Sequence, residues 1–283
     1  MNPALGSRWH LTQGYQHAQG RIAYDCWGDG PPVVLVHGTP FSSFVWRNIV
    51  PALSERWTVY AYDLLGYGQS EMRAGQDVSL GVQNGILAEL LDYWGLDRPA
   101  IVGHDFGGAT VLRTHLLNGR LFRCVVLIDA VALSPWGSPF VQHVRRFEEA
   151  FQGLPEYIHK AILAAYLQDA ADQKLDEDVS KAYMDPWIGP VGQPAFYRQI
   201  AQMDQRYTDE VQGRYEELEL PVLILWGEQD RWIPKDKGEE LHRLMANSTL
   251  KLVPQAGHLV QEDRLDLTQT ALIEFLSNNY RAE

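Results

Sequence analysis

The stretch Gly103-His104-Asp105-Phe106-Gly107-Gly108 decides how the rest of the chain is interpreted. It follows the apolar run 100–102 and precedes residues 109–117, whose apolar spacing predicts a helix. A strand, a glycine-rich tight turn and a helix together form a strained turn that presents one side chain above the sheet edge. Two glycines flank the aspartate, so the presented side chain is predicted to be a carboxylate.

Outside this turn, short apolar runs alternate with segments of helical spacing. Runs typical of strands that are buried on both faces lie at 32–36, 57–62, 100–102, 123–128, 220–226 and 249–253. Helices are predicted at 46–53, 79–93, 109–117 and 265–278. The alternation predicts an α/β fold with a mostly parallel sheet and helices on both faces. Residues 8–13 and 21–27 alternate apolar and polar side chains, which predicts an antiparallel pair of strands before the parallel ones.

The alternation stops after residue 129 and resumes at residue 220. Residues 130–217 show helical segments, many aromatic side chains and no clear strand. A helical insertion between two sheet strands is typical of a cap over a catalytic face. We therefore expect a first core segment at 1–129, a helical cap at 130–217 and a second core segment at 218–283.

Composition excludes several classes of partner. The formal net charge of −12 argues against nucleic acid or an anionic membrane surface. Residues 1–10 lack the apolar core of a signal peptide, and no apolar run approaches the ~20 residues of a membrane span. Cys26 and Cys124 lie in separate apolar segments and form no motif, so we expect reduced, buried thiols in a cytoplasmic protein.

Three predicted strand ends carry side chains that suit nucleophilic catalysis. Asp105 ends one strand, Asp230 follows the next-to-last strand and His258 follows the last. Because the carboxyl ends of parallel strands meet at one edge of a sheet, these side chains are expected to lie together. Nucleophile, acid and histidine in this chain order form a recognised type of catalytic triad. Asp129, at the end of the strand after Asp105, is an alternative acid.

These residues and two further motifs resemble α/β-hydrolase fold enzymes with an aspartate nucleophile, a branch that includes epoxide hydrolases and haloalkane dehalogenases. The further motifs are His37-Gly38-Thr39-Pro40 and Asp63-Leu64-Leu65-Gly66-Tyr67-Gly68-Gln69-Ser70. The resemblance spans nearly the full chain outside the cap and implies the α/β-hydrolase fold. It also implies that Asp105 attacks an sp3 carbon and forms an alkyl ester, which water activated by His258 then hydrolyses.

The same resemblance implies roles for the surrounding groups. The backbone N–H groups of Thr39 and Phe106 are expected to stabilise the oxyanion formed during ester hydrolysis. Asp230 is expected to orient His258 and to stabilise its charged form. Asp129 stays open as the triad acid, because some relatives supply the acid from the end of that strand.

Departures from the relatives' patterns bear on the leaving group. Haloalkane dehalogenases usually hold halide with an asparagine after His-Gly and a tryptophan after the nucleophile, where this chain has Thr39 and Phe106. One halide donor is therefore missing unless Trp136 or Trp187 supplies it from the cap. Fluoroacetate dehalogenases carry arginines just after the nucleophile; this chain has none there, so an anionic substrate is not expected.

Epoxide hydrolases use cap tyrosines to protonate the leaving alkoxide, and residues 194–198 resemble the segment that carries one of them. Tyr197 is therefore the expected cap acid, with Tyr157 or Tyr166 as the second donor. The aromatic side chains expected to line the substrate pocket are Trp136, Tyr157 and Trp187.

The expected function is hydrolysis of a small, largely apolar, uncharged electrophile, with an epoxide as the first candidate and a haloalkane as the second. An ester hydrolase is disfavoured because the turn carries no serine. A ligand receptor on the same scaffold is disfavoured because binding alone needs no catalytic triad. The expected partners are a small-molecule substrate and water. No cofactor and no metal are expected, and the oligomeric state is not predicted.

Overall fold

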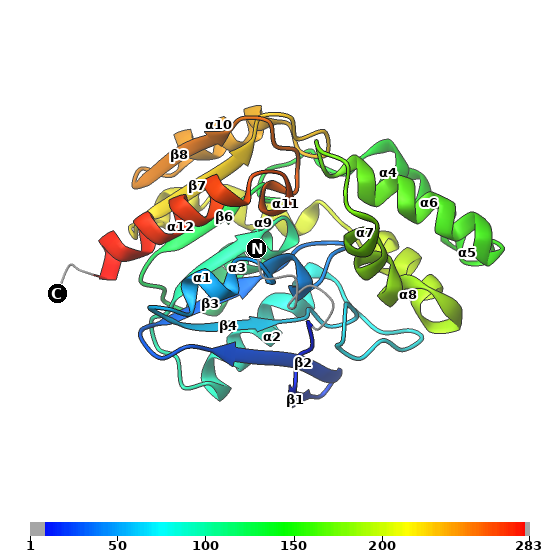
Figure 1. The fold of residues 1–283 in the computed structure, drawn as a ribbon, viewed down its shortest axis with the longest axis horizontal. Helices are drawn as coiled ribbons and strands as arrows, with labels where there is room; N and C mark the ends of the chain where they lie inside the picture. The colour runs from blue at the N-terminus through cyan, green and yellow to red at the C-terminus, as the bar shows by residue number, and fades with distance from the viewer. Residues whose placement is uncertain (1–8, 281–283) are drawn as a thin grey trace.

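A single eight-stranded sheet runs through residues 9–280, the part of the chain that the computed structural model describes (Figure 1). The strands are β1 (Gln13–His17), β2 (Gly20–Trp27), β3 (Pro32–Val36), β4 (Thr58–Tyr62), β5 (Ala100–His104), β6 (Val125–Ile128), β7 (Val222–Gly227) and β8 (Ser248–Val253). Their order across the sheet is β1-β2-β4-β3-β5-β6-β7-β8. Only the β1–β2 and β2–β4 pairs are antiparallel, so the predicted mostly parallel sheet is confirmed.

The first strand lies later in the chain than its pattern predicted. The expected strand at 8–13 is wrong, and residue 8 lies outside the described part of the chain. β1 begins at Gln13 and pairs with β2 across a two-residue turn. The reason lies one residue earlier, where the Thr12 N–H and hydroxyl both donate to Asp25 Oδ2, at 3.0 and 2.8 Å. Thr12 therefore binds a side chain instead of joining the sheet ladder.

Two layers of helices cover the sheet. The core helices are α1 (Val50–Leu53), α2 (Leu80–Tyr93), α3 (Phe106–Asn118), α10 (Lys235–Leu244), α11 (Val260–Asp263) and α12 (Leu265–Tyr280), with the 3₁₀ turn η2 (Ser43–Trp46). α1 and α12 lie in front of the sheet in Figure 1, whereas α2 packs on α3 behind it. No helix within 9–280 is long and apolar enough to cross a bilayer.

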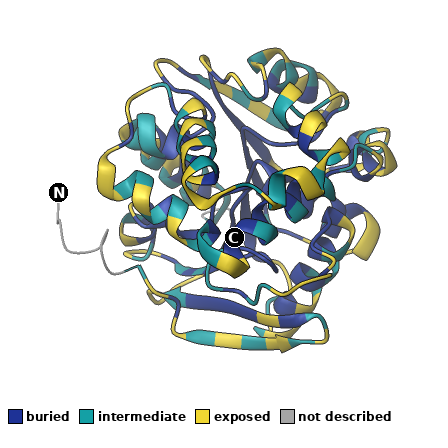
Figure 2. Cartoon of the chain, turned by 90° about the vertical axis from the view of Figure 1, so that its right-hand side faces the viewer, coloured by how far each residue is buried: buried dark blue, intermediate teal, exposed yellow. Residues whose placement is uncertain are grey.

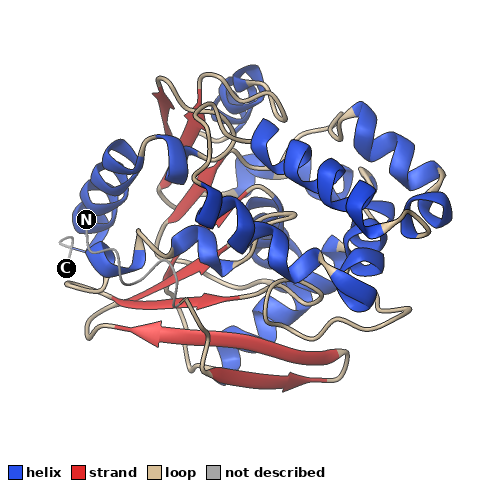
Figure 3. Ribbon diagram, turned by 45° about the vertical axis from the view of Figure 1, so that its right-hand side comes forward, coloured by secondary structure: helices blue, strands red, loops and turns tan. Residues whose placement is uncertain are grey.

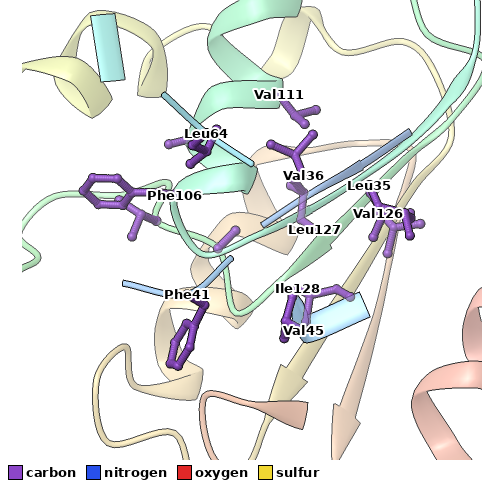
Figure 4. Packing of buried hydrophobic residues seen from close by; sticks show 14 of the residues in the cluster. Leu35, Val36, Phe41, Val45, Leu64, Phe106, Val111, Val126, Leu127 and Ile128 are labelled. Carbon is purple, nitrogen blue, oxygen red and sulfur yellow. The ribbon is translucent and has the colours of Figure 1, made fainter. Parts of the chain in front are cut away.

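Burial on both faces explains the composition of the central strands. Every residue of β5, β6 and β7 is buried, which is the environment that continuous Val, Ile and Leu runs predict (Figure 2). Figure 4 shows part of this cluster, including Val36 of β3, Val111 of α3 and Leu127 of β6. Cys124 is also buried and Cys26 is half-buried, and both are free thiols.

Between β6 and β7 all of the regular secondary structure is helical. Its helices are α4 (Pro139–Arg146), α5 (Glu148–Gln152), α6 (Glu156–Asp169), α7 (Glu177–Met184), α8 (Gly189–Ala201) and α9 (Arg206–Gln212), with 3₁₀ turns η3 (Asp185–Trp187) and η4 (Tyr215–Glu217). α4, α5, α6 and α8 gather at one side of the sheet (Figures 1 and 3). We call residues 130–217 the cap; the division of the chain at its two ends stays a prediction.

Candidate active site

Asp105 occupies a strained turn between β5 and α3. Its backbone has φ 51° and ψ −117°, a combination that L-residues rarely adopt. Flanking glycines let the turn close, because a Cβ on Gly107 would lie 2.1 Å from the Val36 carbonyl oxygen. The Asp105 N–H donates to the Ile128 carbonyl at 3.0 Å, which ties the turn to β6. The surrounding structure thereby holds a carboxylate, only 3% exposed, at the carboxyl end of β5.

His258 joins Asp105 to Asp230. Its Nδ1 donates to Asp230 Oδ2 at 2.8 Å, and its Nε2 lies 3.4 Å from Asp105 Oδ2. Asp230 is fixed in turn, since its Oδ1 accepts the N–H groups of Trp232 and Ile233 at 2.8 and 2.9 Å. All three ionisable side chains are buried. The structure therefore brings the predicted nucleophile, histidine and acid into one continuous chain of contacts.

The carboxylates on either side determine the charge of His258. Burial by itself disfavours the imidazolium, but Asp230 and Asp105 outweigh burial and raise the pKa of His258 well above 6.5. Ester formation on Asp105 would remove one of these two negative charges. The pKa of His258 would then fall, so the imidazolium present before alkylation would lose its proton more readily and the neutral ring would be available to accept a proton.

Asp129 lies at the end of β6 but does not bind the histidine ring. Its Oδ1 accepts the Gly227 N–H at 2.8 Å, and its Oδ2, though buried, has no hydrogen-bond partner among the described residues. Burial and the nearby charge of Asp230 raise the pKa of Asp129 well above 3.8. Because His258 Nδ1 is bound to Asp230, the geometry favours Asp230 over Asp129 as the triad acid.

Two further buried histidines brace the loops around the triad. His104 Nε2 donates to the His258 carbonyl at 2.9 Å, and burial together with the charge of His258 lowers the pKa of His104 to about 3. His37 Nε2 accepts the Leu64 N–H at 2.9 Å, so its Nδ1 carries the proton and donates to the Gly38 carbonyl at 2.9 Å. Both rings therefore support backbone without carrying charge.

One expected oxyanion donor already binds the nucleophile. The Thr39 N–H donates to Asp105 Oδ1 at 2.7 Å, and the other carboxylate oxygen, Oδ2, faces His258. Phe106 is the first residue of α3, and among the described residues no hydrogen bond joins its N–H to the Asp105 carboxylate. Its role as the second donor stays a prediction.

A small cavity lies over the carboxylate. Its volume is about 40 Å³, and its walls include Asp105, Phe106, Trp136, Tyr166 and Trp232. At ~10–15 Å³ for each water molecule, it has room for only a few waters, so a substrate must be small or the cap must move. No basic side chain lines the cavity within the described part of the chain.

A larger cleft of about 570 Å³ lies elsewhere, between core residues such as Arg47 and the residues of α7. Asp105, His258 and Asp230 do not line it. We therefore place the candidate site at the smaller cavity, because Asp105 is one of its lining residues. Across residues 9–280, no group of three His, Cys, Asp or Glu side chains is arranged to hold a metal ion.

Tyr197, the expected cap acid, does not line this cavity. Its hydroxyl lies 2.9 Å from His159 Nδ1, and His159 Nε2 lies 2.8 Å from the Trp187 carbonyl. A carbonyl only accepts, so Nε2 carries the proton of the neutral ring and Nδ1 must accept from the phenol. Burial lowers the pKa of His159, which keeps the ring neutral. The phenolic proton of Tyr197 is therefore already used inside the cap.

The three residues that were expected to line the substrate pocket lie in different environments. Trp136 lines the cavity, but its indole N–H donates to Thr208 Oγ1 at 2.9 Å. Trp187 is buried and donates to the Pro40 carbonyl at 2.7 Å, but it does not line the cavity, so the expectation that it lines the pocket is corrected. Tyr157 lies on the cap surface with 72% of its area exposed, so the expectation that it lines the pocket is corrected. Its turn of α6 faces solvent.

Tyr166, named in advance only as a possible second donor, is the cap tyrosine that reaches the cavity. Its ring stacks on Trp232 at 4.4 Å between centroids, and Trp232 lies 5.0 Å from the ring of His258. The hydroxyl of Tyr166 makes no hydrogen bond to a described residue. Trp232 was missed by sequence reasoning, although its place two residues after Asp230 was an available signal.

Comparison with known proteins agrees with this architecture. Residues 31–265 match the family described as alpha/beta hydrolase fold. The crystal structure of an alpha/beta hydrolase fold protein from Burkholderia ambifaria is 51% identical, with a TM-score of 0.92 over 94% of this chain and 98% of that one.

Two curated enzymes are similar over most of their length. Haloalkane dehalogenase 2 of Mycobacterium tuberculosis is 28% identical over 282 residues, which are 95% of this chain and 94% of the relative. The 2-hydroxy-6-oxo-2,4-heptadienoate hydrolase of Pseudomonas putida is 31% identical over 254 residues, or 83% of this chain and 84% of the relative. Together with the match over residues 31–265, these similarities show that the chain belongs to the alpha/beta hydrolase fold family.

Proposed function

We propose that this protein is a hydrolase that opens a small uncharged epoxide through an ester on Asp105. The observation that carries the proposal is the cavity that the Asp105 carboxylate shares with the unpaired phenol of Tyr166. Ring opening needs a nucleophile at carbon and a proton at oxygen, and these two groups can supply them.

In the first step, Asp105 Oδ2 attacks a ring carbon and the C–O bond of the epoxide breaks. Oδ2 is the better placed oxygen, because Oδ1 already accepts the Thr39 N–H. The Tyr166 phenol gives its proton to the alkoxide, which leaves a hydroxyalkyl ester and a phenolate. Burial raises the pKa of Tyr166 well above 10.0, so the phenol keeps its proton until the more basic alkoxide forms.

In the second step, the imidazolium of His258 returns a proton to the phenolate and becomes a neutral base. Water then loses a proton to Nε2 and attacks the ester carbon of Asp105. Negative charge develops on Oδ1, where the Thr39 N–H already points. The ester C–O bond breaks, the leaving alkoxide takes the second proton of the water, and a diol is released. The Asp105 carboxylate and the His258 imidazolium are restored.

The cap donors support an alkoxide as the leaving group. A departing halide needs N–H donors, but the indole N–H groups of Trp136 and Trp187 already donate to Thr208 and Pro40. The indole N–H of Trp232 donates to Asp169 at 3.2 Å. The phenol of Tyr166 is a donor that stays available at the cavity, and it can transfer a proton.

Haloalkane dehalogenation is the second candidate. The observation that favours it is the 28% identity to a relative named haloalkane dehalogenase 2 over 95% of this chain. It would use the same Asp105 ester, so the two candidates differ only in the leaving group and in the need for Tyr166.

The test is a panel of small terminal epoxides and 1-haloalkanes of matched chain length, with diol and halide measured separately. We expect diol from epoxides, and none from the Asp105→Asn variant. Halide release without diol would replace the first candidate by the second. No product from either class by folded enzyme would refute both.

A further inference from the structure

We propose that Gln199 is a positioning residue through which the cap sets the oxyanion-binding N–H of Thr39. The inference rests on the proposed function, because it concerns hydrolysis of the Asp105 ester. Gln199 belongs to α8 and was not among the residues that the sequence singled out. It is 2% exposed, so its side chain acts inside the molecule.

A short series of hydrogen bonds runs from the cap to the nucleophile. Gln199 Oε1 accepts the Thr39 hydroxyl at 2.6 Å and the Tyr67 hydroxyl at 3.1 Å. The backbone N–H of the same Thr39 donates to Asp105 Oδ1 at 2.7 Å. The Thr39 hydroxyl also accepts a longer hydrogen bond from the Tyr67 hydroxyl, at 3.3 Å. Thr39 is therefore held most closely by Gln199 of the cap through its side chain while it holds the nucleophile through its main chain. A shift of Gln199 would move the N–H that faces Oδ1.

Packing alone does not explain a glutamine at this position. The Nε2 of Gln199 is buried and has no hydrogen-bond partner among the described residues. Turning the amide over would leave the carbonyl oxygen without its donors instead. A buried amide with one unsatisfied end is less favourable than an apolar side chain of the same shape. The contact with Thr39 supplies a reason for a glutamine at this position that packing does not.

The two chemical steps should respond differently to this contact. During alkylation the Asp105 carboxylate loses charge, so the Thr39 N–H gives no advantage to that transition state. During ester hydrolysis negative charge returns to Oδ1, and the same N–H stabilises it. Misplacing the N–H should therefore slow hydrolysis and spare alkylation. A loss of cap stability would instead affect both steps.

Gln202 provides a matched control. It follows α8 directly and also ties the cap to the core, since its Oε1 accepts the Val78 N–H at 2.7 Å and its Nε2 donates to the Gln76 carbonyl at 2.9 Å. Neither hydrogen bond involves Thr39. Gln199→Met and Gln202→Met thus remove the same type of side chain from neighbouring places, and only one of them acts on the oxyanion loop.

The experiment is a single-turnover reaction with a small epoxide, in which rapid quenching and intact-mass spectrometry follow ester formation and decay. For Gln199→Met we expect decay to slow roughly 10-fold, less than the roughly 10²–10³-fold that removal of an oxyanion donor costs. Formation should change by less than about 3-fold, and Gln202→Met should change neither step beyond that margin. Thr39→Val should slow decay in the same way, and the double variant with Gln199→Met should be no slower than the slower single variant.

The inference is wrong if Gln199→Met slows formation and decay together, if Gln202→Met has the same effect, or if the losses of Thr39→Val and Gln199→Met multiply. These outcomes would contradict the role of Gln199 but not the formation of an ester on Asp105. If the parent enzyme forms no ester with any epoxide or haloalkane, the proposed function fails first and this inference falls with it.

Discussion

Replacing Tyr197 and Tyr166 one at a time by phenylalanine separates a structural tyrosine from a catalytic one. Tyr197→Phe removes the donor to His159 Nδ1, which lies 2.9 Å from the hydroxyl. Burial lowers the pKa of His159, so the ring does not recover by taking up a proton. A buried acceptor left without a donor costs about 1–3 kcal/mol. At about 2–4 °C for each kcal/mol, Tm should fall by about 2–12 °C.

Tyr166→Phe should leave stability nearly unchanged and slow epoxide opening. Its hydroxyl makes no hydrogen bond to a described residue, so the free energy of unfolding should change by less than about 0.5 kcal/mol. Loss of a positioned proton donor should slow epoxide opening by roughly 10²-fold, or about 2.7 kcal/mol of barrier. Any halide release should change much less, because a halide leaves as a stable anion.

The assay pairs thermal denaturation with single-turnover ester formation for both variants. We expect a lower Tm with near-parental ring opening for Tyr197→Phe, and a parental Tm with slow ring opening for Tyr166→Phe. If Tyr197→Phe slows ring opening as much as Tyr166→Phe does, Tyr197 is the cap acid after all, and the assignment from the cavity is wrong.

Three further predictions concern the buried charges. Asp230→Asn should stall hydrolysis of the ester whereas Asp129→Asn should not, and quenched-flow measurement of ester decay tests this; the reverse order would make Asp129 the triad acid. Burial raises the pKa of Asp129 well above 3.8, so the stability that its neutral carboxyl contributes below pH 3.8 is lost as the pH rises through the folded pKa. The Tm of Asp129→Asn relative to the parent should therefore be higher at pH 8 than at pH 5, and an equal difference at the two pH values would contradict this. An NMR titration should place the pKa of His258 well above 6.5 and find it lower in Asp105→Asn; an unchanged value would mean that Asp105 does not stabilise the imidazolium.

The strand ends of this chain could be predicted because local signals mark them. The glycines around Asp105, and the positions of Asp230 and His258 just after apolar runs, follow from period and turn chemistry alone. The same signals did not separate Asp230 from Asp129, because both end neighbouring parallel strands. Only the direction of each side chain separates them, and that depends on the tertiary structure.

The cap was harder to interpret from sequence. Tyr197 and Tyr166 are both aromatic residues on cap helices, and what distinguishes them is that α6 places His159 against one phenol and leaves the other at the cavity. The spacing of residues in the sequence does not show whether the hydroxyl of a tyrosine already donates a hydrogen bond to another side chain. Gln199 carries no local signal for the same reason, since its partner Thr39 lies 160 residues away in the chain.

The central claim is that Asp105 forms a covalent ester and that His258 is needed only to hydrolyse it. The most direct measurement is intact-mass spectrometry of His258→Gln after exposure to a small epoxide, followed by peptide mapping. The account predicts a stable increase in mass equal to that of the whole substrate, located on the peptide that contains Asp105. Undiminished steady-state turnover, no increase in mass, or an adduct on another residue would contradict it.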